Sequence, residues 1–233
     1  MKILTWNILA SEWIKKSYYP TVRDQTLFNP DKRIHIIIDK LRKESADIVF
    51  LQEVMPMEYK LLYQKFNRTY RLSRLTPIQW SKTKSTKGES ESESGNVTLV
   101  KKGIFETWSE TSFDHGIYVR IDQLHLFNIH LHDTSHYKRK KQLDQILLHD
   151  KKYVVLAGDF NQPYKDTHLY QLPGFIAHNL CNTYFVEKNM NIDNILTKGL
   201  KRSVDSCQYL PTSVEEGLSM YGSDHIPVTA TVT

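Results

Sequence analysis

The chain has 233 residues, of which 40% are hydrophobic, and its formal net charge is +5 at pH 7. This size suits one domain, and no run nears the ~20 apolar residues that cross a bilayer, which excludes integral membrane association. The basic balance favours a polyanionic partner such as nucleic acid but does not identify one. Cys181 and Cys207 show no metal-clip or disulfide-framework spacing, so we expect an intracellular protein, cytoplasmic or nuclear. We also expect a monomer.

The first half of the chain alternates apolar strand patterns with helical ones. Residues 3–8 read as a strand, and the polar, aromatic-bearing residues 11–29 as a long loop with at most one helical turn. A helix is predicted to begin at Pro30, because Asn29 is a good N-cap and apolar residues follow at helical spacing. Residues 48–51 form a continuous apolar run typical of a buried strand, and Pro56 could begin a second helix.

The second half begins with a break in the pattern. Residues 81–95 are rich in Ser, Lys and Glu, cannot bury a core, and are predicted to be a mobile loop. Strands are predicted at 97–100, 118–121, 124–130, 153–157, 192–196 and 228–232, with a helix around Leu143, Ile146 and Leu147. Strands in close succession mixed with about three helices indicate an α+β sandwich, and we expect residues 1–233 to form a single domain.

Polar side chains recur where apolar strands are predicted to end. The residues concerned are Asn7, Gln52, Glu53, His130, Asp159, Asn161, Asp193, Asp224 and His225. Singly, each would cap a turn or face water. Together, carboxylates at one rim repel each other unless a cation or a proton resolves the conflict. Oxygen ligands favour magnesium, and the lack of a Cys-rich or multi-His set argues against zinc.

Six segments carry a family resemblance: TWNILA, LQEV, FNIHLHD, LAGDFN, NIDNIL and SDHIPV. In this order they resemble the signature segments of the endonuclease/exonuclease/phosphatase superfamily, and they span Thr5 to Val228. The resemblance implies a four-layer α/β/β/α sandwich of two packed mixed sheets, with helices outside and the active site at one rim.

Finer features are similar to the deadenylase, nocturnin and 2′-phosphodiesterase branch. They are the form WNILA, the insert with Tyr18-Tyr19-Pro20, Arg33 before LQEV, and the segment from His130 to Gln142. The sequence departs from common patterns at Asn191, where an arginine is common, and at Asn194, where a tyrosine is common.

The resemblance also implies a metal site. Glu53 is expected to be the principal Mg²⁺ ligand, with Mn²⁺ as a substitute, and Asn7 and Asp224 are expected to contribute. Such an ion polarises a phosphoryl oxygen and offsets charge on the leaving oxygen. A second metal held by Asp159 and Asn161 is left open.

The remaining members of the set are implied to act on water and phosphate. Asp159 and His225 are candidates for orienting or deprotonating the attacking water, with Asp193 or Asp224 holding the His225 ring. His130 and Asn161 would donate hydrogen bonds to non-bridging oxygens of the transition state.

Two further groups could contact the substrate. Tyr18 and Tyr19 could stack on bases, although loop aromatics more often pin a loop to the core. The basic run Lys138, Arg139, Lys140 and Lys141 could track phosphates, although a solvated helix face is the simpler interpretation.

These features predict a magnesium-dependent nuclease that attacks single-stranded RNA or oligonucleotides with water in line. The same site acting on 5′-tyrosyl-DNA, abasic DNA, an inositol phosphate or a sphingolipid headgroup is the alternative. A non-catalytic binding module is disfavoured, because such a relative usually loses at least one of these side chains.

Overall fold

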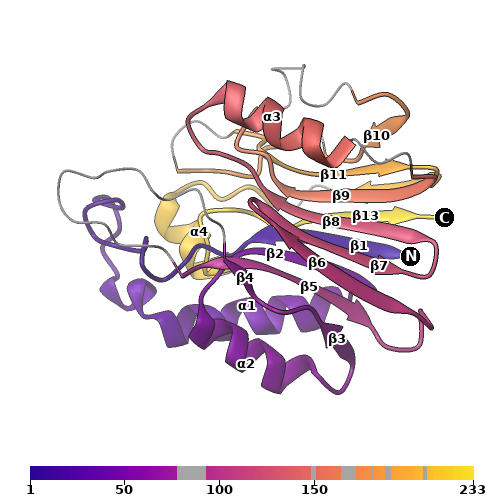
Figure 1. Cartoon of the computed structure of the whole chain (residues 1–233). Helices are drawn as coiled ribbons and strands as arrows, with labels where there is room; N and C mark the ends of the chain where they lie inside the picture. The colour runs from indigo at the N-terminus through magenta and orange to yellow at the C-terminus, as the bar shows by residue number, and fades with distance from the viewer. Residues whose placement is uncertain (78–92, 148–150, 164–171, 180, 187–189, 207–208) are drawn as a thin grey trace.

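The computed structural model describes residues 1–77, 93–147, 151–163, 172–179, 181–186, 190–206 and 209–233. In these ranges two β-sheets pack face to face, with helices on both outer sides (Figure 1). Both termini lie at one end of the sandwich, and the long loop after the first strand lies at the other (Figure 1). The predicted four-layer α/β/β/α sandwich is confirmed.

The first sheet, sheet A, has the strand order β12-β13-β1-β2-β5-β3, with β4 paired to β5. Its strands are β1 (Lys2–Asn7), β2 (Ile48–Val54), β3 (Tyr70–Leu72), β4 (Thr76–Pro77), β5 (Gly95–Lys101), β12 (Arg202–Ser206) and β13 (Val228–Val232). Within the described residues β1 and β2 run parallel and the other neighbours antiparallel, so the sheet is mixed.

The second sheet, sheet B, has the order β10-β11-β9-β8-β7-β6. Its strands are β6 (Trp108–Phe113), β7 (Gly116–Ile121), β8 (Leu124–His130), β9 (Tyr153–Asp159), β10 (Phe175–Ala177) and β11 (Asp193–Lys198). Here β8 and β9 form the parallel pair. Each sheet therefore places the carboxyl ends of two parallel strands at one rim.

Helices cover the outer faces. They are the short 3₁₀ helix η1 (Gln25–Phe28), α1 (Pro30–Glu44), α2 (Pro56–Phe66), α3 (His136–Leu147) and α4 (Val214–Tyr221). The helices α1, α2 and α4 pack on sheet A, and α3 packs on sheet B (Figure 1). The predicted start of α1 is confirmed, because Asn29 Oδ1 accepts from the Asp31 and Lys32 amides. Sequence reasoning missed α4, although Ser213 caps it.

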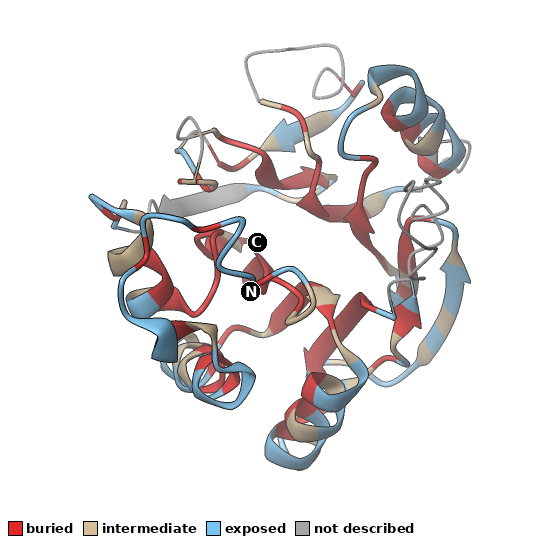
Figure 2. Ribbon diagram, turned by 90° about the vertical axis from the view of Figure 1, so that its left-hand side faces the viewer, coloured by how far each residue is buried: buried red, intermediate tan, exposed pale blue. Residues whose placement is uncertain are grey.

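Strand alternation decides which side chains lie between the sheets. In β1, Ile3 packs into the core between the sheets, whereas Leu4 and Trp6 pack under the helices of sheet A. Residues two apart point to the same side. Asn7 therefore points into the space between the sheets. Figure 2 looks along the sandwich from the end at which β1 finishes.

Most of the expected mobile loop, residues 81–92, lies outside the described residues, whereas Gly95, the last residue of that predicted loop, is the first residue of β5. Cys181 is disulfide-bonded, although the cysteine spacing gave no sign of a disulfide framework. The only other cysteine, Cys207, lies outside the described residues. Sequence spacing could not reveal such a bond.

Among the described residues, no helix is long and apolar enough to cross a membrane.

Candidate active site

The predicted polar residues meet at one rim, but not all at strand ends. Asn7, His130 and Asp159 are the last residues of β1, β8 and β9. Asp193 instead begins β11, so its expected place at a strand's carboxyl end is wrong. It reaches the same rim because β11 runs antiparallel to β9, which pairs Asp193 with Asp159. Asp224 likewise precedes β13, the antiparallel partner of β1.

Glu53 reaches the site through a local irregularity in β2. Regular alternation would turn it under the helices together with Leu51. The register between β2 and β5 shifts between Leu51 and Val54, and Glu53 has a φ of 58°. Bulges with left-handed residues re-aim side chains and often adjoin active sites. The bulge brings the Glu53 carboxylate to Asn7, whose Nδ2 donates to Glu53 Oε1 at 2.8 Å.

Gly158 allows Asp159 to lie where it does. The φ of Gly158 is 148°, and a Cβ there would fall 1.8 Å from the carbonyl oxygen of Ile129 on β8. A side chain at this position would push β8 and β9 apart. The glycine of the LAGDFN segment is therefore required by the close approach of the two parallel strands.

Three nitrogen atoms converge on Asp159 Oδ2. Asn7 Nδ2 donates to it at 3.1 Å, and Nε2 of His130 lies at 3.6 Å. Nε2 of His225 lies at 3.9 Å from the same oxygen. His130 Nε2 is also 3.9 Å from Glu53 Oε1. The carboxylate of Asp159, which is buried, is thus the centre of the arrangement.

His225 is oriented by Asp193. Its Nδ1 lies 2.8 Å from Asp193 Oδ2, both residues being buried. This contact fixes the ring with Nδ1 donating, and turns Nε2 toward Asp159 and Asp224. Sequence reasoning left Asp193 and Asp224 as alternative partners, and the geometry selects Asp193. Burial opposes protonation, but the charges of Asp193 and Asp224 raise the pKa of His225 well above its ordinary value.

Asp224 is held by an aromatic residue of the long loop. The hydroxyl of Tyr19 donates to Asp224 Oδ2 at 3.0 Å, and only 5% of Tyr19 is exposed. The expectation that Tyr19 stacks on a base is therefore wrong, because its ring is buried in the protein. Tyr18 is 54% exposed and stays available for stacking. Burial raises the pKa values of Asp159 and Asp224, as does the charge of a neighbouring carboxylate.

The donor set fits a hard divalent cation. Ligand atoms of Asp159, Asp193 and His225 lie within 4.8 Å of one another. Asp193 and His225 are hydrogen-bonded to each other, so these three residues together are poorly suited to bind a metal ion. Asp224 Oδ1 is buried without a hydrogen-bond partner, and the Glu53 side chain is 16% exposed. Unsatisfied carboxylate oxygen beside an accessible carboxylate is what Mg²⁺ or Mn²⁺ requires.

Other predicted residues have different surroundings. Asn161 Nδ2 donates to the Leu131 carbonyl at 2.8 Å, which uses one of its two amide hydrogens. Arg139 is buried and donates to the carbonyl oxygens of His132 and Asp133, so its place in a phosphate track is wrong. It faces inward because every third or fourth residue of α3 packs on sheet B. The other three members of the basic run, Lys138, Lys140 and Lys141, are exposed.

Tyr184 was missed by sequence reasoning. Its ring centroid lies 5.0 Å from that of His225, and the two residues form an isolated β-bridge. It follows the disulfide-bonded Cys181 in a segment without regular periodicity, so nothing in the sequence pointed to it.

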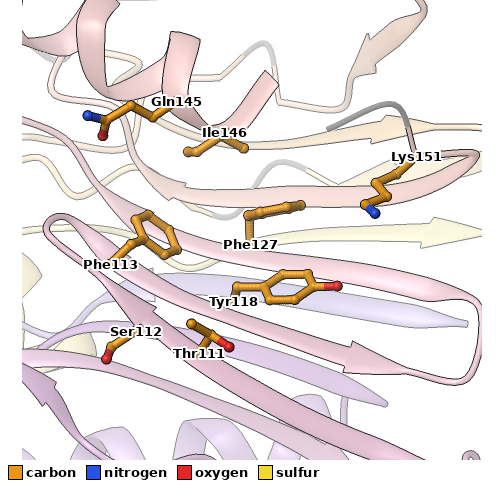
Figure 3. A pocket seen from close by; sticks show the side chains of 8 residues that line it. All are labelled: Thr111, Ser112, Phe113, Tyr118, Phe127, Gln145, Ile146 and Lys151. Atoms are coloured by element: carbon orange, nitrogen blue, oxygen red, sulfur yellow. The ribbon is translucent and has the colours of Figure 1, made fainter. Parts of the chain in front are cut away.

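A cavity of about 240 Å³ lies elsewhere, between α3 and the outer face of sheet B (Figure 3). Its lining residues are Thr111, Ser112, Phe113, Tyr118, Phe127, Gln145, Ile146 and Lys151. Among the described residues its lining offers neither a carboxylate nor a histidine, whereas the rim gathers both.

The chain belongs to the Endonuclease/Exonuclease/phosphatase family, whose model matches residues 4–225. It is therefore a metal-dependent hydrolase of phosphate esters, as the motifs predicted. No curated protein sequence matches the chain significantly.

Solved structures show the same fold. ANGEL2, a 2′,3′-cyclic phosphatase crystallised with adenosine-2′,3′-vanadate, has a TM-score of 0.76 at 12% identity, covering 99% of this chain and 94% of its own. D. rerio TDP2 with a single-strand DNA product has a TM-score of 0.65 at 16% identity, and the match covers 100% of this chain and 98% of the TDP2 chain. The human nocturnin catalytic domain with a bound sulfate has a TM-score of 0.63 at 14% identity, and the match covers 100% of this chain and 93% of the nocturnin chain.

Proposed function

We propose that this chain hydrolyses phosphodiester bonds in single-stranded nucleic acid, with RNA preferred and Mg²⁺ as the cation. The observation that carries the proposal is the convergence of Asn7, His130 and His225 on Asp159 Oδ2. One carboxylate surrounded by nitrogen donors suits a reaction in which water loses a proton while charge grows on phosphoryl oxygens. We further propose that residues 1–233 form one domain around this site.

Glu53 and Asp224 would hold the cation, with Asn7 beside them. When bound, it polarises the phosphoryl group and offsets charge on the leaving oxygen. Asp159 orients the attacking water and accepts its proton at Oδ2. His130 and His225 present Nε2 toward the same point, where they donate to the non-bridging oxygens.

The substrate class is inferred from the surroundings of the site. Trp13 and Tyr18, on the loop after β1, are 38% and 54% exposed and could stack on unpaired bases. The ANGEL2 complex contains an adenosine derivative, and nocturnin belongs to the branch that the motifs resemble. Both support RNA over duplex DNA.

A time course with five substrates tests this proposal. Oligo(A), a mixed-sequence RNA, duplex DNA with an abasic site, a 5′-tyrosyl oligonucleotide and an inositol phosphate are each incubated with Mg²⁺ and, separately, with EDTA. We expect cleavage of the two RNAs to be fastest and to stop in EDTA. Faster turnover of any of the other three would overturn the substrate class. Full activity in EDTA would overturn the metal chemistry.

A further inference from the structure

Arg33 is a buried arginine at the start of α1. Only 1% of it is exposed, although its neighbours on the same helix face are isoleucines of the core. Burying a guanidinium is costly unless hydrogen bonds satisfy most of its donors, and in Arg33 the terminal nitrogen Nη1 is the one without a partner. Nε donates to the Gly222 carbonyl at 2.6 Å, and one terminal nitrogen donates to the carbonyls of Ile8, at 2.7 Å, and Leu9.

The Ile8 and Leu9 carbonyls belong to the loop after β1, which contacts the proposed metal ligand Glu53 and its neighbour Asn7. Leu9 has a φ of 56°, a conformation that a leucine rarely adopts. In this conformation the carbonyls face Arg33 and the amides face the site. The Leu9 amide donates to Asn7 Oδ1 at 3.0 Å, and the Ala10 amide donates to Glu53 Oε2 at 2.9 Å.

The Gly222 carbonyl belongs to the loop that carries Asp224. Gly222 has a φ of 66°, and a Cβ there would lie 2.9 Å from the Arg33 carbonyl oxygen. The next residue, Ser223, donates through Oγ to the Asn7 carbonyl at 2.7 Å and accepts from the His225 amide at 3.1 Å. The Arg33 guanidinium therefore connects the loop that follows Asn7 with the loop that carries Asp224 and His225.

We propose that Arg33 is a positioning residue that sets the affinity for the divalent cation by aiming Glu53 and Asp224 through these two loops. The inference rests on the proposed function, in which those two carboxylates hold the cation. A lysine in its place cannot reproduce the contacts, because a compact ammonium lacks the planar fork that reaches three carbonyls on two loops.

The chain offers a matched control in its other half. Arg139 lies in the first turns of α3 and donates to the His132 and Asp133 carbonyls, at 2.8 Å each, and to Gln162 Oε1 at 3.0 Å. It fastens the loops after β8 and β9, which carry neither Glu53 nor Asp224. Arg139→Lys therefore makes the same chemical change without disturbing Glu53 or Asp224.

Direct Mn²⁺ binding to the full chain, measured by electron paramagnetic resonance, is the test. Arg33→Lys should raise the Mn²⁺ dissociation constant by about tenfold or more, because removing a group that orients a metal ligand usually has an effect of this size. Arg139→Lys should stay within about twofold, because it lies in a separate network. In assays at saturating metal, Arg33→Lys should keep the substrate KM, whereas its metal activation constant rises.

Glu53→Gln distinguishes a failure of the proposed ligand set from a failure of the proposed role of Arg33. If Glu53→Gln binds Mn²⁺ like the wild type, the proposed ligand set is wrong. If Glu53→Gln loses binding and Arg33→Lys keeps it, only the role of Arg33 is wrong. Equal losses in Arg33→Lys and Arg139→Lys would indicate general loosening and also overturn the role.

A second variant covers the case in which Arg33→Lys does not fold, as judged by thermal unfolding in EDTA. Gly222→Ala displaces one carbonyl partner and leaves the guanidinium in place. It should weaken Mn²⁺ binding in the same direction, and unchanged binding in a folded Gly222→Ala variant would overturn the proposal.

Discussion

Glu53 and Asp193 are both acidic residues at the same rim, yet their surroundings differ. Both oxygens of Glu53 accept from uncharged donors, Asn7 Nδ2 and the Ala10 amide, and the side chain keeps some exposure. Asp193 is fully buried and gives one oxygen to His225. A carboxylate that is hydrogen-bonded only to neutral donors can bind a cation, whereas a carboxylate that is hydrogen-bonded to a histidine orients the histidine ring. Environment therefore separates two residues that sequence position treats alike.

The largest expected effect comes from the Glu53 side of this comparison. Glu53→Gln should lower kcat/KM by about 1000-fold, since removing a charge that anchors the metal costs roughly 4 kcal/mol of transition-state stabilisation. The thermal unfolding temperature should fall only modestly, because the single amide oxygen of glutamine can still accept from the Ala10 amide and only the contact with Asn7 Nδ2 is lost. Retention of more than about a tenth of the wild-type rate would show that Glu53 does not anchor the metal.

Asp193→Asn should have a smaller effect of a different kind. Asparagine fits the same space but no longer favours Nδ1–H, so we expect about a 100-fold loss of kcat with the Mn²⁺ dissociation constant unchanged. The pKa of His225 should fall, because burial, which lowers it, is then opposed by fewer negative charges. Histidine NMR titration in EDTA measures this, and an unchanged His225 pKa would contradict the pairing.

Tyr19→Phe sharpens the comparison at Asp224. The ring keeps its packing against Phe28, at a centroid distance of 6.3 Å, while Asp224 Oδ2 loses its donor. Losing a hydrogen bond to a charged group costs about 1.5–3 kcal/mol, so activity at limiting Mg²⁺ should fall by about tenfold or more. Tyr18→Phe is the control, because Tyr18 is exposed and should tolerate the change. Equal effects of the two variants would argue against a special role for Tyr19.

The smallest expected effect belongs to the exposed lysines of α3. Replacing Lys138, Lys140 and Lys141 by serine, with the buried Arg139 kept, should raise KM for RNA by about threefold and leave kcat unchanged. The slope of log KM against log salt should fall by up to about one for each lysine that pairs with a phosphate in the wild type. Cleavage rates at several salt concentrations measure it. An unchanged slope would mean that this face is merely solvated.

Much of the fold could be predicted because its signals are local. The α1 start follows from Asn29 and Pro30, and the apolar run of β2 follows from residues 48–51. Short elements such as β3, β4 and β10 were missed because two or three residues carry no periodicity. The helix α4 has a serine cap, but its eight residues gave a weak pattern.

By itself, the sequence determined which residue types stand at the rim, because alternation along β1, β8 and β9 sends Asn7, His130 and Asp159 to one side. Only the tertiary structure decided how the others act. The bulge that re-aims Glu53 and the antiparallel pairing that brings Asp193 to His225 depend on neighbouring strands. Contacts between segments far apart in the chain leave no periodic trace, and that is why these assignments needed the fold.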